Sequence, residues 1–404
     1  MAELKAADEV APADRLRALR RLHGLTQLDL ATRSSVSVSQ LAKVEERRKQ
    51  MSWDLASKIA PVLRVSPGRL LGERWREESA RPSKLDDAVP GIRRQIALYN
   101  AVPDLERPPA SIEHLHTRLE EACRMRLDAR YDSLACVITP LLEQLTAVAL
   151  EAGGRRREQA MWMLAAAYRC ADALVYKLGY LDLAAAAADR VAWAAEHSGD
   201  ELMVATAAYV RAEGFFDADA YVRGKRMLTQ AAEKLAVRAS GDVRAASVYG
   251  AMHSRAAVLA AKAGDAREAA SHLRMAASAA SLLERDCEYF YTSFGPSNLR
   301  IHQVAVHVEL GDGAAALAAA GDWAPPRAMP AERASHHYID LARAQIWEGD
   351  LNAAIASLAR AAQLAPLHAR THPEARAAAE TILLRSRTGS RLTVELAATL
   401  GLIA

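Results

Sequence analysis

Apolar residues recur at intervals of three and four positions along most of the chain, and turn residues separate these runs. This spacing predicts amphipathic helices throughout. From residue 12 to residue 74 the runs are short, as in a small domain of short helices. Residues 76–90 are charged, contain two prolines and have little to bury, which is typical of a linker. We therefore expect an all-α fold with a head (1–75), a linker (76–90) and a helical body (91–404).

The body begins with a short helix predicted at residues 91–99 and an antiparallel pair predicted at 111–130 and 133–151. From residue 158 onward the pattern repeats: an amphipathic helix, a tight turn and an alanine-rich helix, about every 40 residues, which is in the range of helical-hairpin repeats. We expect a right-handed superhelix of such hairpins, closed by a capping helix at 374–387. The predicted turns are Leu178-Gly179, an irregular one at 217–219, Gly264-Asp265, Gly311-Asp312 and Gly349-Asp350.

Two of these hairpins carry small residues at equal offsets, which lets their two helices approach closely. This is the tetratricopeptide pattern, and a generic alanine-rich bundle is the alternative. The small residues are Ala257, Ala269 and Ala276 in one hairpin, and Ala342, Ala354 and Ala361, followed by Pro366, in the other.

Charge is distributed unevenly along the chain. The whole chain has 52 basic and 49 acidic residues, whereas residues 1–75 hold 14 and 9, so a basic head precedes a nearly neutral body. The four cysteines are too few and too far apart for a disulfide framework or a metal knuckle, and we interpret them as reduced core residues. No signal pattern or membrane span is evident in the sequence, so we expect a cytoplasmic protein.

The segment from Leu25 to Gly72 gives the clearest indication of function in the chain. Thr26 is a good N-cap for a short helix at 27–33, and Ser37 can cap a second helix at 38–46. We expect one apolar seam made of Leu28, Ala31, Val36, Leu41 and Val44. The residues left facing outward on the second helix are Val38, Ser39, Gln40 and Lys43, followed by the basic Arg47, Arg48 and Lys49.

Such a helix suits the DNA major groove, and basic residues directly after it suit the flanking phosphates. The arrangement is a helix-turn-helix. The alternatives are a solvated helix face used for protein contacts and an ordinary charged loop.

Several short motifs resemble the xenobiotic-response-element family of bacterial helix-turn-helix regulators, which implies a lambda-repressor-like head. By this resemblance Thr26, Gln27 and Ser37 join the DNA-contacting set, and Glu45 is a buried acidic brace. Three positions depart from the family pattern: Ser35 and Arg64 replace glycines, and Pro61 falls in the last turn of the predicted fourth helix, where it removes a backbone hydrogen bond. The matching motifs are Thr26-Gln27, Leu30-Ala31, Val36-Ser37, Leu41, Val44-Glu45, Val65-Ser66 and Leu70-Leu71-Gly72.

The body adds to this resemblance. Residues 291–302, 305–312 and 334–343 are similar to the C-terminal repeat domain of such regulators from high-GC Gram-positive bacteria. The layout is also similar to that of peptide-pheromone receptors, in which a repeat domain binds a signal and controls DNA binding. The resemblance does not identify the effector.

Residues expected on the concave face of the repeats are candidate ligand contacts, because a mixture of aromatic, amide and charged groups suits an extended peptide or another small-molecule signal. For any single residue, filling a gap between repeats is the alternative. Asn298, just after the helix-starting break at 295–297, is the strongest candidate. The full set is Arg169, Tyr176, Tyr209, Glu213, Phe216, Asn298, His302, Glu309, His336 and Arg343.

No cofactor, metal site or catalytic constellation is expected. The pairs His336-His337 and His368, His372 lack a completing cysteine or carboxylate cluster, and Pro373 interrupts the helical register of the second pair. No nucleophile motif or phosphate-binding loop is present in the sequence.

The sequence therefore favours a transcription regulator that binds double-stranded DNA as a homodimer on a pseudo-palindromic operator, with the body supplying the dimer contact. Two alternatives remain. One is a helical scaffold whose head contacts another protein. The other is a constitutive repressor whose repeats only dimerise.

Overall fold

The computed structural model describes residues 11–63, 65, 67–71, 85–385 and 391–402, and every structural statement below refers to these residues. They form an all-α fold, as predicted, with one isolated antiparallel bridge between Cys287 and Phe294. The chain divides into two compact units. One unit contains residues 1–81 and 338–404, and the other contains residues 82–337.

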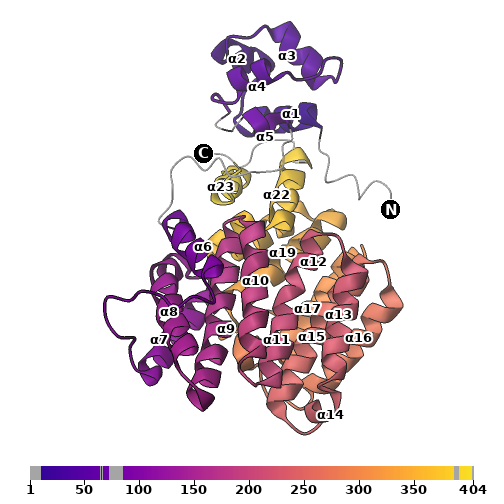
Figure 1. Ribbon diagram of the computed structural model, residues 1–404. Helices are drawn as coiled ribbons and strands as arrows, with labels where there is room; N and C mark the ends of the chain where they lie inside the picture. The colour runs from indigo at the N-terminus through magenta and orange to yellow at the C-terminus, as the bar shows by residue number, and fades with distance from the viewer. Residues whose placement is uncertain (1–10, 64, 66, 72–84, 386–390, 403–404) are drawn as a thin grey trace. The chain divides into compact units, whose positions relative to one another are not determined.

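The N-terminal head, residues 11–71, contains five short helices: α1 (Pro12–Leu22), α2 (Gln27–Arg33), α3 (Val38–Glu45), α4 (Trp53–Ile59) and α5 (Pro67–Leu71) (Figure 1). Every helix of the head contributes to its core, and leucine predominates there. Representative core residues, none more than 4% exposed, are Leu16, Leu19, Leu30, Leu41, Leu55, Ile59, Leu63 and Leu70.

The predicted apolar seam is wrong at one position. Leu28 is 62% exposed, whereas Leu30, two residues further along α2, is fully buried. Successive helix residues are rotated by about 100°, so the buried face of α2 is centred on Leu30 and Ala31 and leaves Leu28 on the outside. Val36, Leu41 and Val44 pack against the core as expected.

The second unit begins with helices that continue into the predicted linker. Leu85 is buried, and η2 (Asp86–Ala88) leads into α6 (Val89–Ala97), which matches the short helix predicted at 91–99. Residues 76–84 of the predicted linker lie outside the described residues. The pair predicted at 111–130 and 133–151 corresponds to α7 (Ile112–Leu127) and α8 (Tyr131–Glu151).

The remaining helices form consecutive hairpins, coloured from magenta to orange in Figure 1. In the second unit they are α9 (Gly154–Lys177) with α10 (Leu181–Glu196), α11 (Glu201–Arg211) and α12 (Glu213–Asp217) with α13 (Tyr221–Glu233), the short α14 (Ala236–Ala239), α15 (Val243–Lys262) with α16 (Ala266–Ala280), and α17 (Pro296–Glu309) with α18 (Gly313–Ala320). Between α16 and α17 lies η3 (Tyr289–Tyr291).

The chain then continues through α19 (Ala331–Trp347), which runs from the second unit into the first. The other helices of the first unit are α20 (Leu351–Leu364), α21 (Pro366–Thr371), α22 (Pro373–Arg385) and α23 (Arg391–Thr399). The described part of the predicted capping helix at 374–387 coincides with α22. The sequence pattern did not predict α23.

The predicted turns are confirmed, and one local mechanism accounts for most of them. Each turn glycine has a positive φ: 85° at Gly179, 81° at Gly264, 78° at Gly311 and 84° at Gly349. Glycine adopts this left-handed conformation without a steric penalty and so ends the first helix of the hairpin. In the last three turns the next residue is an aspartate that caps the second helix. The irregular turn places Asp219 at a φ of 52°.

The small residues of the repeat pattern are buried as predicted. Ala257, Ala269, Ala276, Ala342, Ala354 and Ala361 are all fully buried. Because a methyl group occupies little space, the helices of each hairpin pack closely at these positions.

Helix α8 is long and apolar enough to cross a membrane by length and composition, and about half of its apolar window is buried inside the protein. It packs against α7 and α9 through residues such as Leu134, Ile138 and Leu141. These contacts are those of a core helix.

The four cysteines are free, as expected, but only two of them are core residues. Cys123 and Cys170 are buried and their sulfur atoms lie 3.6 Å apart. Cys136 is exposed and Cys287 is half-buried, so the interpretation of all four as core residues is wrong. At Cys136 the helix α8 turns its outer side to solvent.

Gly250 in the middle of α15 is required by its neighbour Phe294. A Cβ atom at Gly250 would overlap the ring of Phe294, which is fully buried. We expect Gly250→Ala to lower the free energy of unfolding by about 1–3 kcal/mol, because overpacking outweighs the better helix propensity of alanine. Thermal and denaturant unfolding of the full chain would measure this change.

Gly214→Ala is the matched control, since Gly214 is also helical and has no atom within 4 Å of an added Cβ. That variant should be neutral or slightly stabilising. Equal stability of the two variants would contradict the steric role of Gly250.

Candidate DNA-binding face and ligand pocket

Helix α3 presents a short polar face to solvent. Val38, Ser39 and Lys43 are exposed, and Gln40 is half-buried beside them. Leu41 and Val44 anchor the opposite side of α3 in the core of the head. The residues predicted to face a DNA groove therefore lie on the solvent side of one helix.

The N-cap residues of α2 and α3 are exposed, but their hydroxyls are already bonded. Thr26 and Asp29 form a capping box, in which the Thr26 hydroxyl accepts from the Asp29 N–H at 3.1 Å and donates to its carboxylate at 2.6 Å. The Ser37 hydroxyl accepts from the Gln40 N–H at 3.1 Å. Thr26 and Ser37 thus fix where the two helices begin.

Glu45, at the end of α3, is the brace that the resemblance implies. It is 1% exposed. The Arg20 guanidinium donates to both carboxylate oxygens, from Nε to Oε1 at 2.6 Å and from Nη2 to Oε2 at 2.8 Å. Arg20 also donates from Nη1 to the Leu25 carbonyl at 2.8 Å, and Arg17 donates to the Glu45 carbonyl. These bonds join α3 to α1 and to the turn before α2.

Burial opposes ionisation of Glu45, but the hydrogen bonds from Arg20 and Gln27 and the positive charges of Arg20 and Arg17 outweigh it and lower the pKa of this carboxyl. The carboxylate is therefore charged in the folded head at neutral pH.

Gln27, a predicted DNA contact, is part of this brace. Its Nε2 donates to Glu45 Oε2 at 2.8 Å, and the side chain is half-buried. The amide is therefore held by the protein. A contact from Gln27 to DNA remains a prediction, and it would use the amide oxygen or follow a break of this bond.

Two residues other than glycine adopt left-handed backbone conformations at the ends of helices α2 and α3. Ser35 has a φ of 55° and Arg47 a φ of 60°. In both cases the following residue donates its N–H to the carbonyl five positions earlier, Val36 to Ala31 and Arg48 to Lys43, as in a Schellman motif. Ser35, which stands where the family pattern has glycine, therefore still forms the turn, but at a conformational cost that glycine would avoid.

The other two departures have different outcomes. Arg64 lies outside the described residues. Pro61 does not fall in the last turn of a helix as expected, because α4 ends at Ile59 and Ala60 is its C-cap. Proline is well tolerated just beyond a helix end, so no backbone hydrogen bond inside α4 is lost.

The three basic residues after α3 are exposed and have unequal surroundings. Arg47 forms an ion pair with Asp14, and Arg48 Nε lies 3.3 Å from a carboxylate oxygen of Glu46. Lys49 is exposed. Exposed pairs of this kind are weak, so a phosphate can replace the carboxylate partner at little cost.

The second unit contains a partly open pocket, in which the space between the lining atoms, open solvent included, is about 610 Å³. It lies between helices α7, α9, α11, α12, α15 and the start of α19, and its lining is strongly charged. The charged lining residues are Arg126, Arg169, Asp172, Lys177, Glu213, Arg255, Glu332 and Arg333.

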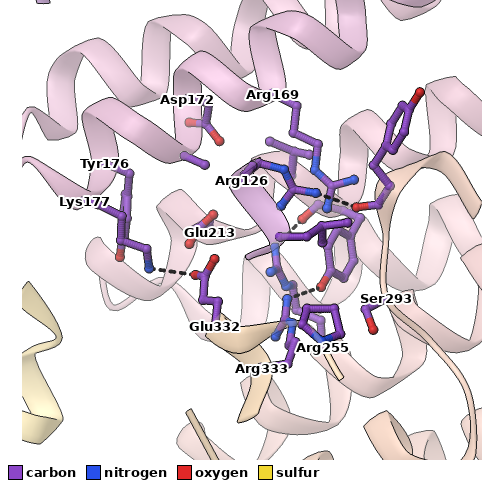
Figure 2. A pocket seen from close by; sticks show the side chains of 16 residues that line it. Arg126, Arg169, Asp172, Tyr176, Lys177, Glu213, Arg255, Ser293, Glu332 and Arg333 are labelled. Carbon is purple, nitrogen blue, oxygen red and sulfur yellow. Dashed lines mark hydrogen bonds and ion pairs between the residues drawn. The ribbon is translucent and has the colours of Figure 1, made fainter. Parts of the chain in front are cut away.

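The guanidinium groups gather on one side of this pocket (Figure 2). Arg126 donates to the Tyr291 carbonyl at 2.6 Å and Arg169 to the Phe290 carbonyl at 2.9 Å. These carbonyls belong to η3, where Phe290 and Tyr291 have positive φ angles of 53° and 54°.

Tyr209 is enclosed by arginines. The Arg255 guanidinium lies 3.7 Å from the centre of the Tyr209 ring and donates to the Tyr209 carbonyl at 2.6 Å. Arg333 donates to the Tyr209 hydroxyl at 3.0 Å. Burial raises the pKa of Tyr209, but the charges of Arg255, Arg333 and Arg169 outweigh it, and the net pKa is lowered.

The carboxylates lie on the other side of the pocket (Figure 2). Lys177 Nζ lies 2.9 Å from Glu332 Oε1, and the Tyr131 hydroxyl donates to Glu332 Oε2 at 3.0 Å. Asp172 is 6% exposed, and burial together with the negative charge of Glu213 raises its pKa well above the usual range.

The structure brings some predicted ligand residues together and separates others. Arg169, Tyr176, Tyr209 and Glu213 line the pocket. Phe216 is half-buried and is not among the lining residues. Asn298 is 1% exposed, and its amide donates to the Ser293 carbonyl, so it supports the pocket loop and does not line the pocket.

The other candidates occupy several environments. His302 is buried and its Nδ1 lies 2.9 Å from the Asn298 carbonyl. Burial and the charge of Arg333 lower the pKa of His302 to about 3, and the same two causes lower the pKa of His336 to about 3. Glu309 pairs with Lys262 at 2.8 Å. Arg343 belongs to the other unit and lies 3.3 Å from a carboxylate oxygen of Glu374.

Sequence reasoning missed half a dozen charged pocket residues. A signal was available, because Asp172 follows Arg169 by three positions within the apolar stripe of α9, and buried charges in a stripe of this kind are uncommon. The sequence contains no comparable signal that these separate helices converge on one pocket. The missed residues are Arg126, Asp172, Lys177, Arg255, Glu332 and Arg333.

Comparison with known proteins gives a family match for the head. Residues 16–70 match the family HTH_3, described as helix-turn-helix. A search of curated proteins found no match. Among solved structures the chain is similar to Bacillus thuringiensis PlcR in complex with the peptide PapR7 and DNA, with 17% sequence identity, a TM-score of 0.33, and coverage of 68% of this chain and 95% of that chain.

The Glu45 brace should contribute to the stability of the head. We expect Glu45→Gln to destabilise the head by about 3 kcal/mol at neutral pH, because it leaves Arg20 without its counter-charge. Since the pKa of Glu45 is lowered in the folded state, its stabilisation is present above the unfolded pKa and is lost as pH falls through the folded value. The difference from the unchanged protein should therefore shrink below about pH 4.

Amide hydrogen exchange of α1 to α4 in the full chain, measured across pH, would report this local stability. Glu46→Gln is the matched control, because Glu46 is the next residue and is exposed. Equal protection in both variants at neutral pH would show that the brace contributes nothing.

Proposed function

Because residues 16–70 form a helix-turn-helix domain, we propose that the chain is a sequence-specific DNA-binding transcription regulator. One observation carries the proposal: the exposed face of α3, with Lys43 in its last turn, is fixed to the core of the head by the buried carboxylate of Glu45. A rigid helix with short polar side chains and one cation fits the major groove.

On this proposal the DNA-contacting set is the predicted one. Ser39, Gln40 and Lys43 read base edges, with Val38 in apolar contact. The phosphate contacts come from Thr26 and Ser37 at the helix starts and from Arg47, Arg48 and Lys49 after α3, and Gln27 contacts phosphate or a base. The domain boundaries at 1–75, 76–90 and 91–404 belong to the same proposal.

We infer further that the regulator acts as a homodimer in the cytoplasm. A single head of this size reads one half-site, and pairing two heads on a pseudo-palindromic operator supplies the missing affinity and specificity. The repeat body would provide the dimer contact.

The body also offers a place for a signal. The charged pocket of the second unit supports the binding of a peptide or small molecule rather than catalysis, because its groups are arranged as hydrogen-bond donors and acceptors without a nucleophile beside a base. Binding there would alter the spacing of the two heads, which requires different affinities for two arrangements of the dimer.

The test is selection of bound duplexes from a random pool by the purified full-length protein at near-physiological salt, followed by sequencing. We expect enrichment of a two-fold symmetric motif. Failure to enrich any sequence at any salt concentration, for the full chain and for residues 1–80 alike, would favour the scaffold with a protein-binding head. Enrichment that is indifferent to cell extract would favour a constitutive repressor.

The assignment of individual contacts makes a sharper prediction. Lys43→Ala should change the preferred sequence and cost about 1–3 kcal/mol at the base pair it reads. Arg48→Ala should weaken binding to all duplexes and reduce the salt slope by about 1, because Arg48 contacts phosphate.

Both variants would be measured by duplex titration at several salt concentrations, on selected and scrambled sequences. Lys234→Ala, an exposed lysine of the second unit, is the control for lost charge alone. If Lys43→Ala and Arg48→Ala had equal effects on every sequence, the division into base and phosphate contacts would be wrong.

A further inference from the structure

The pocket of the second unit holds an arginine cluster, defined as Arg126, Arg169, Arg255 and Arg333. Their hydrogen-bond partners are the carbonyls of Tyr291, Phe290 and Tyr209 and the Tyr209 hydroxyl, all of which are uncharged acceptors in these bonds. In the described part of the chain, no carboxylate lies within 4.0 Å of any of the four guanidinium groups.

Two members of the cluster are deeply buried. Arg126 and Arg169 are each 7% exposed. Burying a guanidinium without a counter-charge is costly, because the protein interior stabilises the charge less than water does. Such a cluster destabilises the protein by itself and is stabilised by an added anion.

Polar atoms at the pocket also lack partners. Arg126 Nε and Ser293 Oγ are buried and have no hydrogen-bond partner within the protein, although their residues line the pocket. A buried donor without an acceptor destabilises the folded protein. An oxygen-rich group in the pocket would supply the missing acceptor.

The acidic groups of the pocket do not neutralise the cluster. Five cationic side chains face three acidic ones. Glu332 is taken up by Lys177 and Tyr131. The pKa of Asp172 is raised well above its usual range by burial and by Glu213, which favours the uncharged carboxyl. The pocket therefore has a surplus of positive charge on its arginine side.

Within the cluster, Arg169 is the member whose charge is disfavoured. Burial and the nearby charge of Arg126 lower the pKa of Arg169 to about 9. The pKa of Arg126 and that of Arg333 are raised, because the negative groups around them, Glu332 among them, outweigh burial. A simple role in bracing η3 would need hydrogen-bond donors for the carbonyls of Phe290 and Tyr291, which neutral side chains can supply. Four convergent guanidinium groups exceed that requirement.

We propose that this pocket binds the oxyanion of a small ligand, a carboxylate or a phosphate, among Arg126, Arg169, Arg255 and Arg333. Guanidinium groups present paired N–H donors that match the oxygens of both anions. The inference rests on the proposed function in one respect: it names the chemistry of the signal that the body recognises.

The Glu213 side of the pocket favours one source of the oxyanion. A ligand with an ammonium group close to its carboxylate would place the cation toward Glu213 and the anion toward the arginines (Figure 2). An amino acid, or a dipeptide such as di-alanine with a free C-terminus, has both groups close together, whereas inorganic phosphate has only the anion. The two sources therefore differ in a measurable way.

The first experiment measures the Tm of the full chain without DNA, at constant ionic strength in sodium chloride. The probes are sodium acetate, inorganic phosphate, di-alanine with a free C-terminus and di-alanine amide. We expect at least one oxyanion probe to raise the Tm by about 2–4 °C at a concentration tenfold above its Kd. Di-alanine should act more strongly than its amide if the natural oxyanion is a carboxylate, and phosphate should act most strongly otherwise.

The variants Arg126→Gln and Arg169→Gln locate the effect. Both variants keep an amide that can donate to the loop carbonyl. Without a probe, Arg169→Gln should match or exceed the unchanged protein in Tm, because it also removes a charge that burial and Arg126 disfavour. The shift caused by the probe should be lost. Arg274→Gln, an exposed arginine on α16, is the control and should retain the whole shift.

The proposal is overturned if no oxyanion raises the Tm of the unchanged protein, or if the shift survives in the arginine variants. A lower Tm in both variants, with the shift retained, would assign Arg126 and Arg169 to bracing alone. If either variant fails to fold, Arg333→Gln decides, since the hydrogen bond of Arg333 is to the Tyr209 hydroxyl.

A separate duplex-binding assay, with and without the most effective probe, keeps the two proposals apart. Oxyanion binding without any duplex binding would support the oxyanion pocket and refute the proposal that the chain is a DNA-binding regulator. Duplex binding without an oxyanion effect on the Tm would refute the proposal of an oxyanion site and would still support a DNA-binding regulator.

Discussion

The buried carboxylate of Glu45 is the interaction on which the head depends. A short helix such as α3 has little stability of its own, and most of what it has comes from packing and from its fixed ends. Glu45 ties the end of α3 to Arg20 on α1 and to Gln27 on α2, so one charged group sets the orientation of both helices of the motif. The exposed side chains of α3 have a defined geometry because the opposite side of the helix is held in this way. A face intended to read base edges requires that rigidity, since specificity depends on the directions of its hydrogen bonds.

Buried charges are arranged differently in the second unit from those in the head. In the head, an acidic and a basic group neutralise each other, and the pair stabilises the fold. In the pocket, four guanidinium groups converge on uncharged acceptors, and their mutual repulsion remains. The strained backbone at Phe290 and Tyr291 lies at the same place, and strain of this kind persists where the surrounding structure holds it.

Local rules in the sequence account for most of the fold. Gly264 and Asp265 predict a turn because one residue adopts a left-handed conformation without penalty and the next caps a helix, and both effects depend only on neighbouring residues. The error at Leu28 has a physical reason as well, because which face of a helix is buried depends on the partner helices and not on the helix alone. Pro61 was expected inside the last turn of the fourth helix, but α4 ends at Ile59, before the proline, because the end of this helix depends on packing that the local pattern does not contain.

By itself, the sequence determined the all-α class, the hairpin turns, the capped helices of the head and the outward residues of α3, because helix periodicity and capping act over a few residues. Tertiary structure alone decided that Gln27 is held by Glu45, that Asn298 supports a loop instead of lining the pocket, and that Arg126, Arg169, Arg255 and Arg333 meet. These four arginines come from four helices that are far apart in the sequence. Only the packing of those helices sets the distances between charges, and those distances determine whether a charge is neutralised or left for a ligand.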